Sequence, residues 1–284
     1  MPDIVGEPLS LDHCQHVERF LARLNSPLSE YSFANLFLFR VVHQYRYVDK
    51  PVPCVLGVTY DGKRHALPLV PLDPSRVHAL LGLAPYIYPL PEQLAGLASS
   101  AGLELHWNEA DSDYVYAAPL LASLEGTRLR AKRAQVRTFE QIVRPAFEPL
   151  TLSNLSRARD VLELWASQVP RPRDGTDYGP CNEALDNFEA LSLSGLLVSD
   201  ASGSPCAFLL ARRLGADSMA VHFAKGNRNH AGVYAYLFSR FAASVCVQWL
   251  NFEQDLGAPG LRQAKRALDP AHQLRKYRLS RAAA

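Results

Sequence analysis

The chain has 284 residues, of which 48% are apolar, 20% charged and 10% aromatic. This balance is typical of globular proteins and excludes a mostly disordered chain and a fibrous one. The formal net charge is only +2, and the longest apolar run, Leu36–Phe39 with Val41 and Val42, is far shorter than the ~20 residues that span a bilayer. The first residues, Met1–Glu7, lack the basic and apolar regions of a secretory signal, which predicts a soluble cytoplasmic protein.

Hydrophobic periodicity predicts helices, a hairpin and strands in the first half of the chain. Asp61-Gly62 between two apolar runs is typical of a tight hairpin turn. The helices are expected at 11–24, 33–42 and 94–101, the hairpin strands at 55–60 and 65–70, and two further strands at 103–107 and 114–117.

The second half repeats this order of elements. Helices are expected at 155–169, 234–247 and 261–268, strands at 193–199, 207–213, 218–224, 249–253 and 274–277, and a loop at 171–180. We therefore predict an α/β (α+β) fold, built as a tandem repeat of two domains, 1–148 and 149–284.

The five cysteines are scattered and form no C-x-x-C motif. This pattern fits a reducing compartment and predicts neither a disulfide framework nor a zinc ribbon. The sequence also lacks the glycine-rich phosphate loops and the nucleophile elbow of common enzyme families. We expect no metal site and no tightly bound cofactor.

Positive charge is concentrated in two segments. Residues 128–144 hold six basic residues against one acid, and residues 262–281 hold seven against one. Such segments indicate a surface that faces a polyanion, or solvated helix faces whose charges pair with acids elsewhere.

The segment from Trp249 to Gly257 carries the densest set of polar groups. In an extended strand, Asn251, Glu253 and Asp255 would share one face. Two neighbouring carboxylates can hold an ammonium group, or one can act as a general base while the other orients it. The alternative is an ion-pair cluster with Arg262 and Lys265 on the following basic helix.

The segment from His222 to Tyr234 runs from a strand through a polar loop into a helix. A loop of this kind can hold an anion at the helix N-terminus. In acyl-CoA acetyltransferases a small residue ends the corresponding motif, whereas Tyr234 stands at that position here. The sequence therefore retains the loop but not the coenzyme A signature.

The chain resembles the C-terminal domain family of bacterial phosphatidylglycerol lysyltransferases. The most specific matching residues are Asn251-Phe-Glu-Gln-Asp-Leu-Gly257, Gly260-Leu-Arg262, Lys265, Pro270 and Lys276-Tyr277, with further matches at Tyr31–Phe37, Leu120–Gly126, Lys132-Arg133, His222-Phe223, Lys225 and Gly232-x-Tyr234. The resemblance implies two tandem acetyltransferase-like (GNAT) domains, similar to the Fem-type peptidoglycan aminoacyltransferases.

The resemblance also implies acyl transfer from aminoacyl-tRNA to an amine or hydroxyl on a small molecule, lipid head group or peptide. From their common strand face we predict that Glu253, Asp255 and Asn251 act in catalysis. We further predict that substrate is bound by His222, Lys225, Tyr234, Arg262 and Lys265, and that tRNA phosphates are bound by Lys132, Arg133 and Lys276. Ala224 stands where the family usually has a glutamate, which argues against a dicationic substrate such as lysine. The alternatives are an acyl-CoA-dependent N-acyltransferase and a non-catalytic module that binds a ligand or RNA.

Overall fold

A computed structural model describes residues 5–99 and 102–282. The chain divides into two compact units. The first unit comprises Met1–Asp113, Gln254–Gly257 and Gln273–Ala284, and the second comprises Tyr114–Glu253 and Ala258–His272. The chain therefore passes between the units four times. These units differ from the predicted division at residue 148 for two reasons. The strands at 113–117 and 146–149 already belong to the second sheet, and the last strand, at 276–281, belongs to the first.

The first unit contains a seven-stranded sheet in the order β1-β2-β3-β4-β5-β14-β6. One face of this sheet packs against α4 through an apolar cluster that includes Leu56, Ala66 and Leu80. The strands are β1 (Glu7–Pro8), β2 (Arg46–Val48), β3 (Cys54–Val58), β4 (Arg64–Pro68), β5 (Tyr86–Pro91), β6 (Leu103–Trp107) and β14 (Lys276–Arg281). The helices are η1 (Leu11–His13), α1 (Cys14–Leu24), α2 (Phe33–Leu38), α3 (Arg40–His43), α4 (Pro74–Leu83), η2 (Glu92–Ser99) and η3 (Glu109–Asp111).

The predicted hairpin is present as β3 and β4, whose register pairs Val55 with Leu67. The expected helix over 33–42 is interrupted at Phe39, which separates α2 from α3. Of the helix expected at 94–101, the last two residues lie outside the described part of the chain. Helix α4 was not predicted, although Pro74 occupies its first position and the Asp73 side chain caps it.

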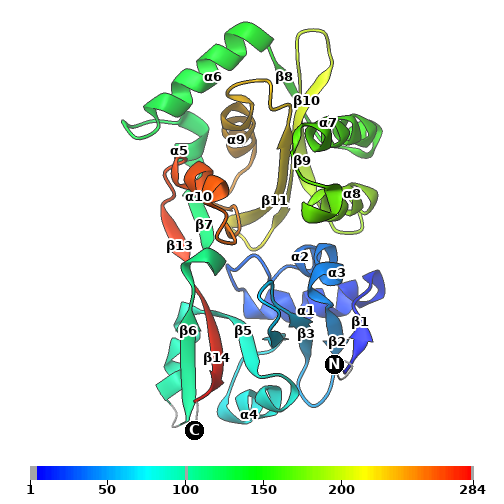
Figure 1. Cartoon of the computed structure of the whole chain (residues 1–284), viewed down its shortest axis with the longest axis vertical. Coiled ribbons are helices and arrows are strands. Elements are labelled where there is room, and N and C mark those ends of the chain that lie inside the picture. The colour runs from blue at the N-terminus through cyan, green and yellow to red at the C-terminus, as the bar shows by residue number, and fades with distance from the viewer. Residues whose placement is uncertain (1–4, 100–101, 283–284) are drawn as a thin grey trace. The chain divides into compact units, whose positions relative to one another are not determined.

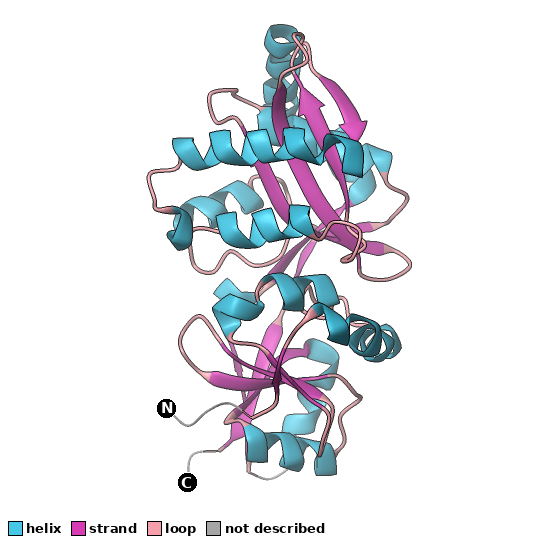
Figure 2. Ribbon diagram, turned by 90° about the vertical axis from the view of Figure 1, so that its right-hand side faces the viewer, coloured by secondary structure: helices cyan, strands magenta, loops and turns pink. Residues whose placement is uncertain are grey.

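The second unit contains a seven-stranded sheet in the order β13-β7-β12-β11-β10-β9-β8. Helix α9 covers one face and α7 and α8 cover the other, as Figure 1 shows, and in Figure 2 these two helices cross in front of the strands. The strands are β7 (Asp113–Ala117), β8 (Ala146–Pro149), β9 (Ser194–Ser199), β10 (Pro205–Arg213), β11 (Ser218–Gly226), β12 (Trp249–Asn251) and β13 (His272–Leu274). The helices are α5 (Ala118–Ser123), α6 (Arg130–Val143), η4 (Leu152–Asn154), α7 (Leu155–Gln168), η5 (Arg173–Gly175), α8 (Tyr178–Asp186), α9 (Val233–Ser244) and α10 (Pro259–Arg266).

Helix α9 begins where the backbone turns sharply at Gly232. This glycine has a φ of +89°, and a Cβ atom there would lie 2.4 Å from the carbonyl oxygen of Gln135 on α6. Only glycine combines that conformation with so close an approach. The requirement fixes the loop between β11 and α9 against α6, so these elements form one packed group.

The predicted loop at 171–180 is wrong at its end, because α8 begins at Tyr178. Gly179 and Pro180 lie in the first turn of that helix. Backbone N–H groups in the first turn have no partner within the helix, so a proline is tolerated there.

Candidate functional site

Strands β11 and β12 pair in parallel over three residues only, from Ser218 and Trp249 to Ala220 and Asn251. Strand β12 then ends, whereas β11 continues to Gly226. The register between β10 and β11 shifts just beyond this point, which leaves His222 as the extra residue of a β-bulge. Bulges of this kind redirect a side chain and are frequent beside active sites.

The Glu253–His222 pair lies at this point. Nδ1 of His222 is 2.8 Å from Oε1 of Glu253. The His222 side chain is completely buried, and the Glu253 side chain is 12% exposed. Nε2 of His222 is buried and makes no hydrogen bond with the described residues. The pair therefore combines a carboxylate that solvent can reach with an imidazole that orients it, an arrangement suited to general acid–base chemistry.

Backbone contacts hold Glu253 in position. The Asn251 side chain accepts a hydrogen bond from the Glu253 N–H at 2.8 Å. The Lys265 ammonium donates to the carbonyl oxygens of Phe252 and Glu253 at 2.6 and 3.1 Å. Glu253 itself has a φ of +59°. Asn251 and Lys265 therefore help to position Glu253, and the substrate contact of Lys265 stays a prediction.

The predicted common strand face of Asn251, Glu253 and Asp255 is wrong. The strand ends at Asn251, and the left-handed conformation of Glu253 breaks the alternation. Asp255 belongs to the first unit, is fully buried and accepts a hydrogen bond from the Gly257 N–H at 2.8 Å. Among the three predicted catalytic residues, Glu253 places its carboxylate beside His222.

Lys225 does not join this pair. Its ammonium lies 2.6 and 2.7 Å from the two carboxylate oxygens of Asp177 and 3.8 Å from the centre of the Trp165 ring. The residue is only 4% exposed. Sequence analysis did not select Asp177, which it assigned to a loop, or Trp165, which it placed in a helix. The charge of Lys225 is thus neutralised by its own chain.

Tyr234 packs against the apolar core of the second unit. Its hydroxyl donates a hydrogen bond to the carbonyl oxygen of Gly226, at 3.5 Å, at the end of β11. Burial raises its pKa. The side chain therefore occupies the end of β11 next to the loop that leads into α9.

The predicted phosphate-binding residues have different surroundings. Lys276 is completely buried, with its ammonium 2.7 Å from Glu30 and 2.5 Å from Asp113, so it is not on a surface that RNA could contact. The Arg133 guanidinium donates to the carbonyl oxygens of Leu124, the C-cap of α5, and of Gly126, two residues further on. Lys132 is half-buried on α6.

Three further arginines of α6 and its C-cap are exposed: Arg130, Arg137 and Arg144. Within the described residues, neither these arginines nor Lys132 form an ion pair. The predicted basic surface over 128–144 therefore corresponds to the outer side of α6. Arg262, which was predicted to bind substrate, lies half-buried on α10.

Three further observations concern cysteines, metal ligands and membrane-spanning helices. All five cysteines are free thiols. Among the described residues, no three histidine, cysteine, aspartate or glutamate side chains gather as a metal site requires. No helix in the same part of the chain has the length and apolarity needed to cross a membrane.

Comparison with known proteins identifies the family. Residues 21–280 match the family described as phosphatidylglycerol lysyltransferase, C-terminal. No curated protein sequence matches the chain significantly. The predicted family and its tandem GNAT-like fold are thereby confirmed.

Three solved structures illustrate the fold. A conserved protein of unknown function from Bacteroides thetaiotaomicron has a TM-score of 0.85 and 22% identity, and the alignment covers 99% of this chain and 100% of that one. L-PGS from Bacillus licheniformis has a TM-score of 0.64 and 14% identity, covering 98% and 94%. FemX has a TM-score of 0.58 and 10% identity, covering 96% of each chain.

Proposed function

The chain belongs to the phosphatidylglycerol lysyltransferase C-terminal family, and we propose that it transfers an aminoacyl group from tRNA to an amine or hydroxyl acceptor. Its fold is of the acyltransferase type. The observation that carries the proposal is the Glu253–His222 pair at the point where β11 and β12 part. An aminoacyl-tRNA donor implies that the reaction takes place in the cytoplasm.

In the proposed reaction, Glu253 acts as the general base. As the acceptor nitrogen or oxygen forms a bond to the acyl carbon, its proton passes to the Glu253 carboxylate. The ester bond between the acyl carbon and the tRNA 3′ oxygen breaks, and that oxygen receives the proton. His222 keeps the carboxylate oriented through the 2.8 Å contact. The same proton transfers apply whether the acceptor is a small molecule, a lipid head group or a peptide.

The direct test follows the aminoacyl group from tRNA to the acceptor. Incubation of the purified chain with a mixture of radiolabelled aminoacyl-tRNAs and a cell extract as acceptor source should move label from RNA to a new product. The Glu253→Gln protein should not do so. Absence of transfer with every aminoacyl-tRNA would contradict the proposal.

Binding of tRNA should weaken steeply with salt. Each phosphate contact lowers the logarithm of affinity by ~0.7–0.9 per tenfold rise in salt. Arg130 and Arg137 on the exposed side of α6, and Arg144 at its C-cap, form no ion pair with the described residues. Replacing Arg130 or Arg137 by glutamine should remove about one phosphate contact. The slope of log affinity against log salt concentration should then become shallower by ~0.7–0.9, as measured by fluorescence anisotropy.

Arg159→Gln provides the matched control. Arg159 lies on α7 and already forms an ion pair with Asp186 at 2.7 Å, so we do not expect it to contact a phosphate. Its slope should equal that of the unaltered chain. Arg133 is unsuitable for this test, since its replacement would also remove its hydrogen bonds to the backbone after α5. If neither replacement changes this slope, the tRNA-binding surface does not include the exposed side of α6.

Acetyl-CoA should bind weakly or not at all. A coenzyme A pyrophosphate needs close approach to the amides of the β11–α9 loop, and the Tyr234 side chain lies at the end of β11 beside that loop. Calorimetric titration checks this expectation. Tyr234→Ala should bind acetyl-CoA more tightly than the unaltered chain, and a low-micromolar dissociation constant for the unaltered chain would favour the acyl-CoA alternative.

A further inference from the structure

Strand β6 forms one edge of the first sheet, where β14 is its neighbour (Figure 1). The hydrogen bond from the Ala282 N–H to the Gly102 carbonyl oxygen, 2.9 Å long, shows which residues of this segment bond to β14. Hydrogen-bonded and non-hydrogen-bonded pairs alternate along an antiparallel ladder, so Glu104 and His106 belong with Gly102 to the bonded set. The backbone N–H and C=O groups of this set face β14.

The other residues of β6, namely Leu103, Leu105 and Trp107, direct their backbone N–H and C=O groups away from the sheet. Within the described residues, no backbone hydrogen bond joins these three to a segment other than β14. The side chains of Leu103 and Leu105 pack against the apolar cluster beside α4, and Trp107, next on the same face, is 44% exposed. The open edge is therefore a row of backbone donors and acceptors beside an aromatic ring that solvent reaches.

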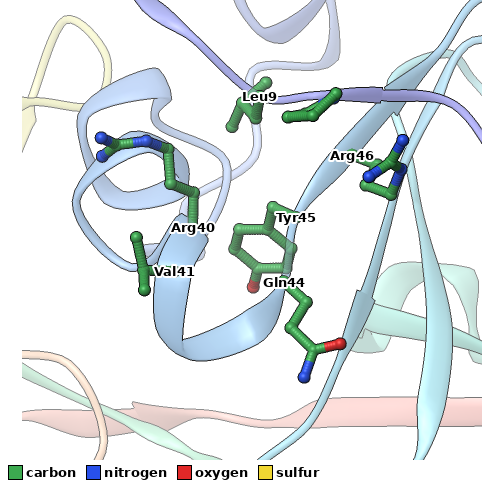
Figure 3. A pocket seen from close by; sticks show the side chains of 7 residues that line it. Leu9, Arg40, Val41, Gln44, Tyr45 and Arg46 are labelled. Carbon is green, nitrogen blue, oxygen red and sulfur yellow. The ribbon is translucent and has the colours of Figure 1, made fainter. Parts of the chain in front are cut away.

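Strand β6 differs from the other edge strands of the two sheets. At the opposite edge of the first sheet, β1 has only two residues and ends in Pro8, which lines an open pocket of about 680 Å³. Figure 3 shows this pocket, with Leu9 next to β1, Arg40 on α3 and Arg46 on β2. In the second sheet, β8 ends in Pro149 and β13 has three residues. Short strands and prolines hinder further pairing at an edge, whereas β6 has five residues and no proline.

The sequence of β6 is complementary to itself when two copies run antiparallel. If Leu105 lies opposite Leu105 of a second copy, Glu104 lies opposite His106, and Leu103 lies opposite Trp107. The two leucine positions and Trp107 would then pair through their outward-facing backbone groups, and Glu104 and His106 would occupy the closer, non-hydrogen-bonded positions. Cross-strand pairs of opposite charge and of apolar side chains both stabilise a sheet.

The side chains that this pairing needs are exposed. Oε2 of Glu104 lies 3.4 Å from Nε2 of His106 in the same chain, and the two side chains are 45% and 58% exposed. In the antiparallel pair, each carboxylate would lie between two imidazoles, one from each copy. The Trp107 ring is held beside the edge, because its Nε1 donates to Ser112 at 2.9 Å and the Arg275 guanidinium lies 4.9 Å from the ring centre.

We propose that the chain forms a homodimer in which two β6 strands pair antiparallel about a two-fold axis at Leu105. The first sheets of the two copies then form one continuous sheet. A two-fold axis uses the same surface on both copies and closes the assembly, so no further chain is added. One short strand gives a small interface, and we expect a dissociation constant on the order of 10 μM. The inference does not depend on acyl transfer or on the Glu253–His222 pair.

The test exchanges the charges on β6 in the full chain, and sedimentation velocity measures the monomer–dimer equilibrium. Glu104→Lys places an ammonium group opposite His106, and His106→Glu places two carboxylates opposite each other. Each variant should weaken its own dimer roughly tenfold, because two favourable pairs are lost. An equimolar mixture of the two variants should recover the affinity. In the mixed dimer the introduced lysine faces the introduced glutamate, and the remaining histidine faces the remaining glutamate.

Glu7→Lys is the matched control, because it makes the same charge change on β1, at the opposite edge of the sheet, where the side chain is 82% exposed. Its dimer should be as strong as that of the unaltered chain. Circular dichroism verifies that all variants are folded. The proposal is overturned by a chain that stays monomeric up to about 500 μM, by a dimer that neither β6 variant weakens, or by a mixture no stronger than the separate variants.

Amide hydrogen exchange gives a readout that needs no substitution. The Leu105 N–H faces the second copy, so its exchange should slow as the protein concentration rises through the dissociation constant. The Glu104 N–H faces β14 and should show the same protection at every concentration. Exchange at Leu105 that is independent of concentration would also contradict the dimer.

Discussion

Replacing Lys276 by methionine should lower the free energy of unfolding by about 3–5 kcal/mol. Methionine has a similar length but carries no charge, so Glu30 and Asp113 would remain buried without the ammonium that lies 2.7 and 2.5 Å from them. The Lys276 ammonium also donates to Gln254 at 2.8 Å, so one side chain joins three separate segments of the first unit. Urea unfolding followed by circular dichroism measures the change.

The pH dependence of the Lys276→Met variant provides a second readout. Burial already raises the pKa of Glu30 to about 7 in the presence of Lys276. Removing the ammonium raises the carboxylate pKa further above its unfolded value, so folded stability is retained at low pH and lost as pH rises. Acidification should therefore recover part of the lost stability.

Arg275→Met is the matched control for Lys276→Met. Arg275 is the preceding residue, but its side chain is 49% exposed and pairs with Glu92 at 3.3 Å. Its loss should cost less than about 1 kcal/mol. A Lys276→Met protein as stable as this control would show that the buried cluster does not support the first unit.

Replacing Glu253 by glutamine should reduce the rate of acyl transfer by about 10²–10⁴-fold, the usual contribution of a general base. Glutamine keeps the shape of the side chain and leaves the contacts of Asn251 and Lys265 with the backbone intact. The protein should therefore remain folded, which circular dichroism can verify. The rate is measured as transfer of a labelled aminoacyl group from tRNA.

Glu148→Gln is the control for Glu253→Gln. Glu148 forms an ion pair with Arg157 at the edge of the second sheet, so its replacement removes a carboxylate outside the Glu253–His222 pair. Its rate should match that of the unaltered chain. An unchanged rate in a folded Glu253→Gln protein would restrict Glu253 to a structural role.

Local sequence signals predicted the elements that depend on local interactions. The hairpin of β3 and β4 follows from a glycine turn between two apolar runs. Strand β5 was missed because it contains Pro89 and Pro91, and prolines argue against a strand. Its neighbour β14 lies almost at the end of the sequence, so no local pattern could indicate the pairing.

The sequence predicted which residues form the candidate site but not how they are arranged. His222 and Glu253 were each selected from the sequence, but their contact joins residues 31 positions apart. The burial of Lys276 could not be predicted, because a lysine near the end of a basic segment is usually exposed. Its partners, Glu30 and Asp113, come from distant parts of the chain.

The position of β14 between β5 and β6 has a consequence for synthesis on the ribosome. The chain emerges from its N-terminus, so β6 is complete long before residues 276–281 appear. Since β6 joins its sheet through β14, the first unit cannot complete its sheet until residues 276–281 have been synthesised. All residues of the second unit precede β14 in the sequence, so this unit can complete its fold before the first unit does.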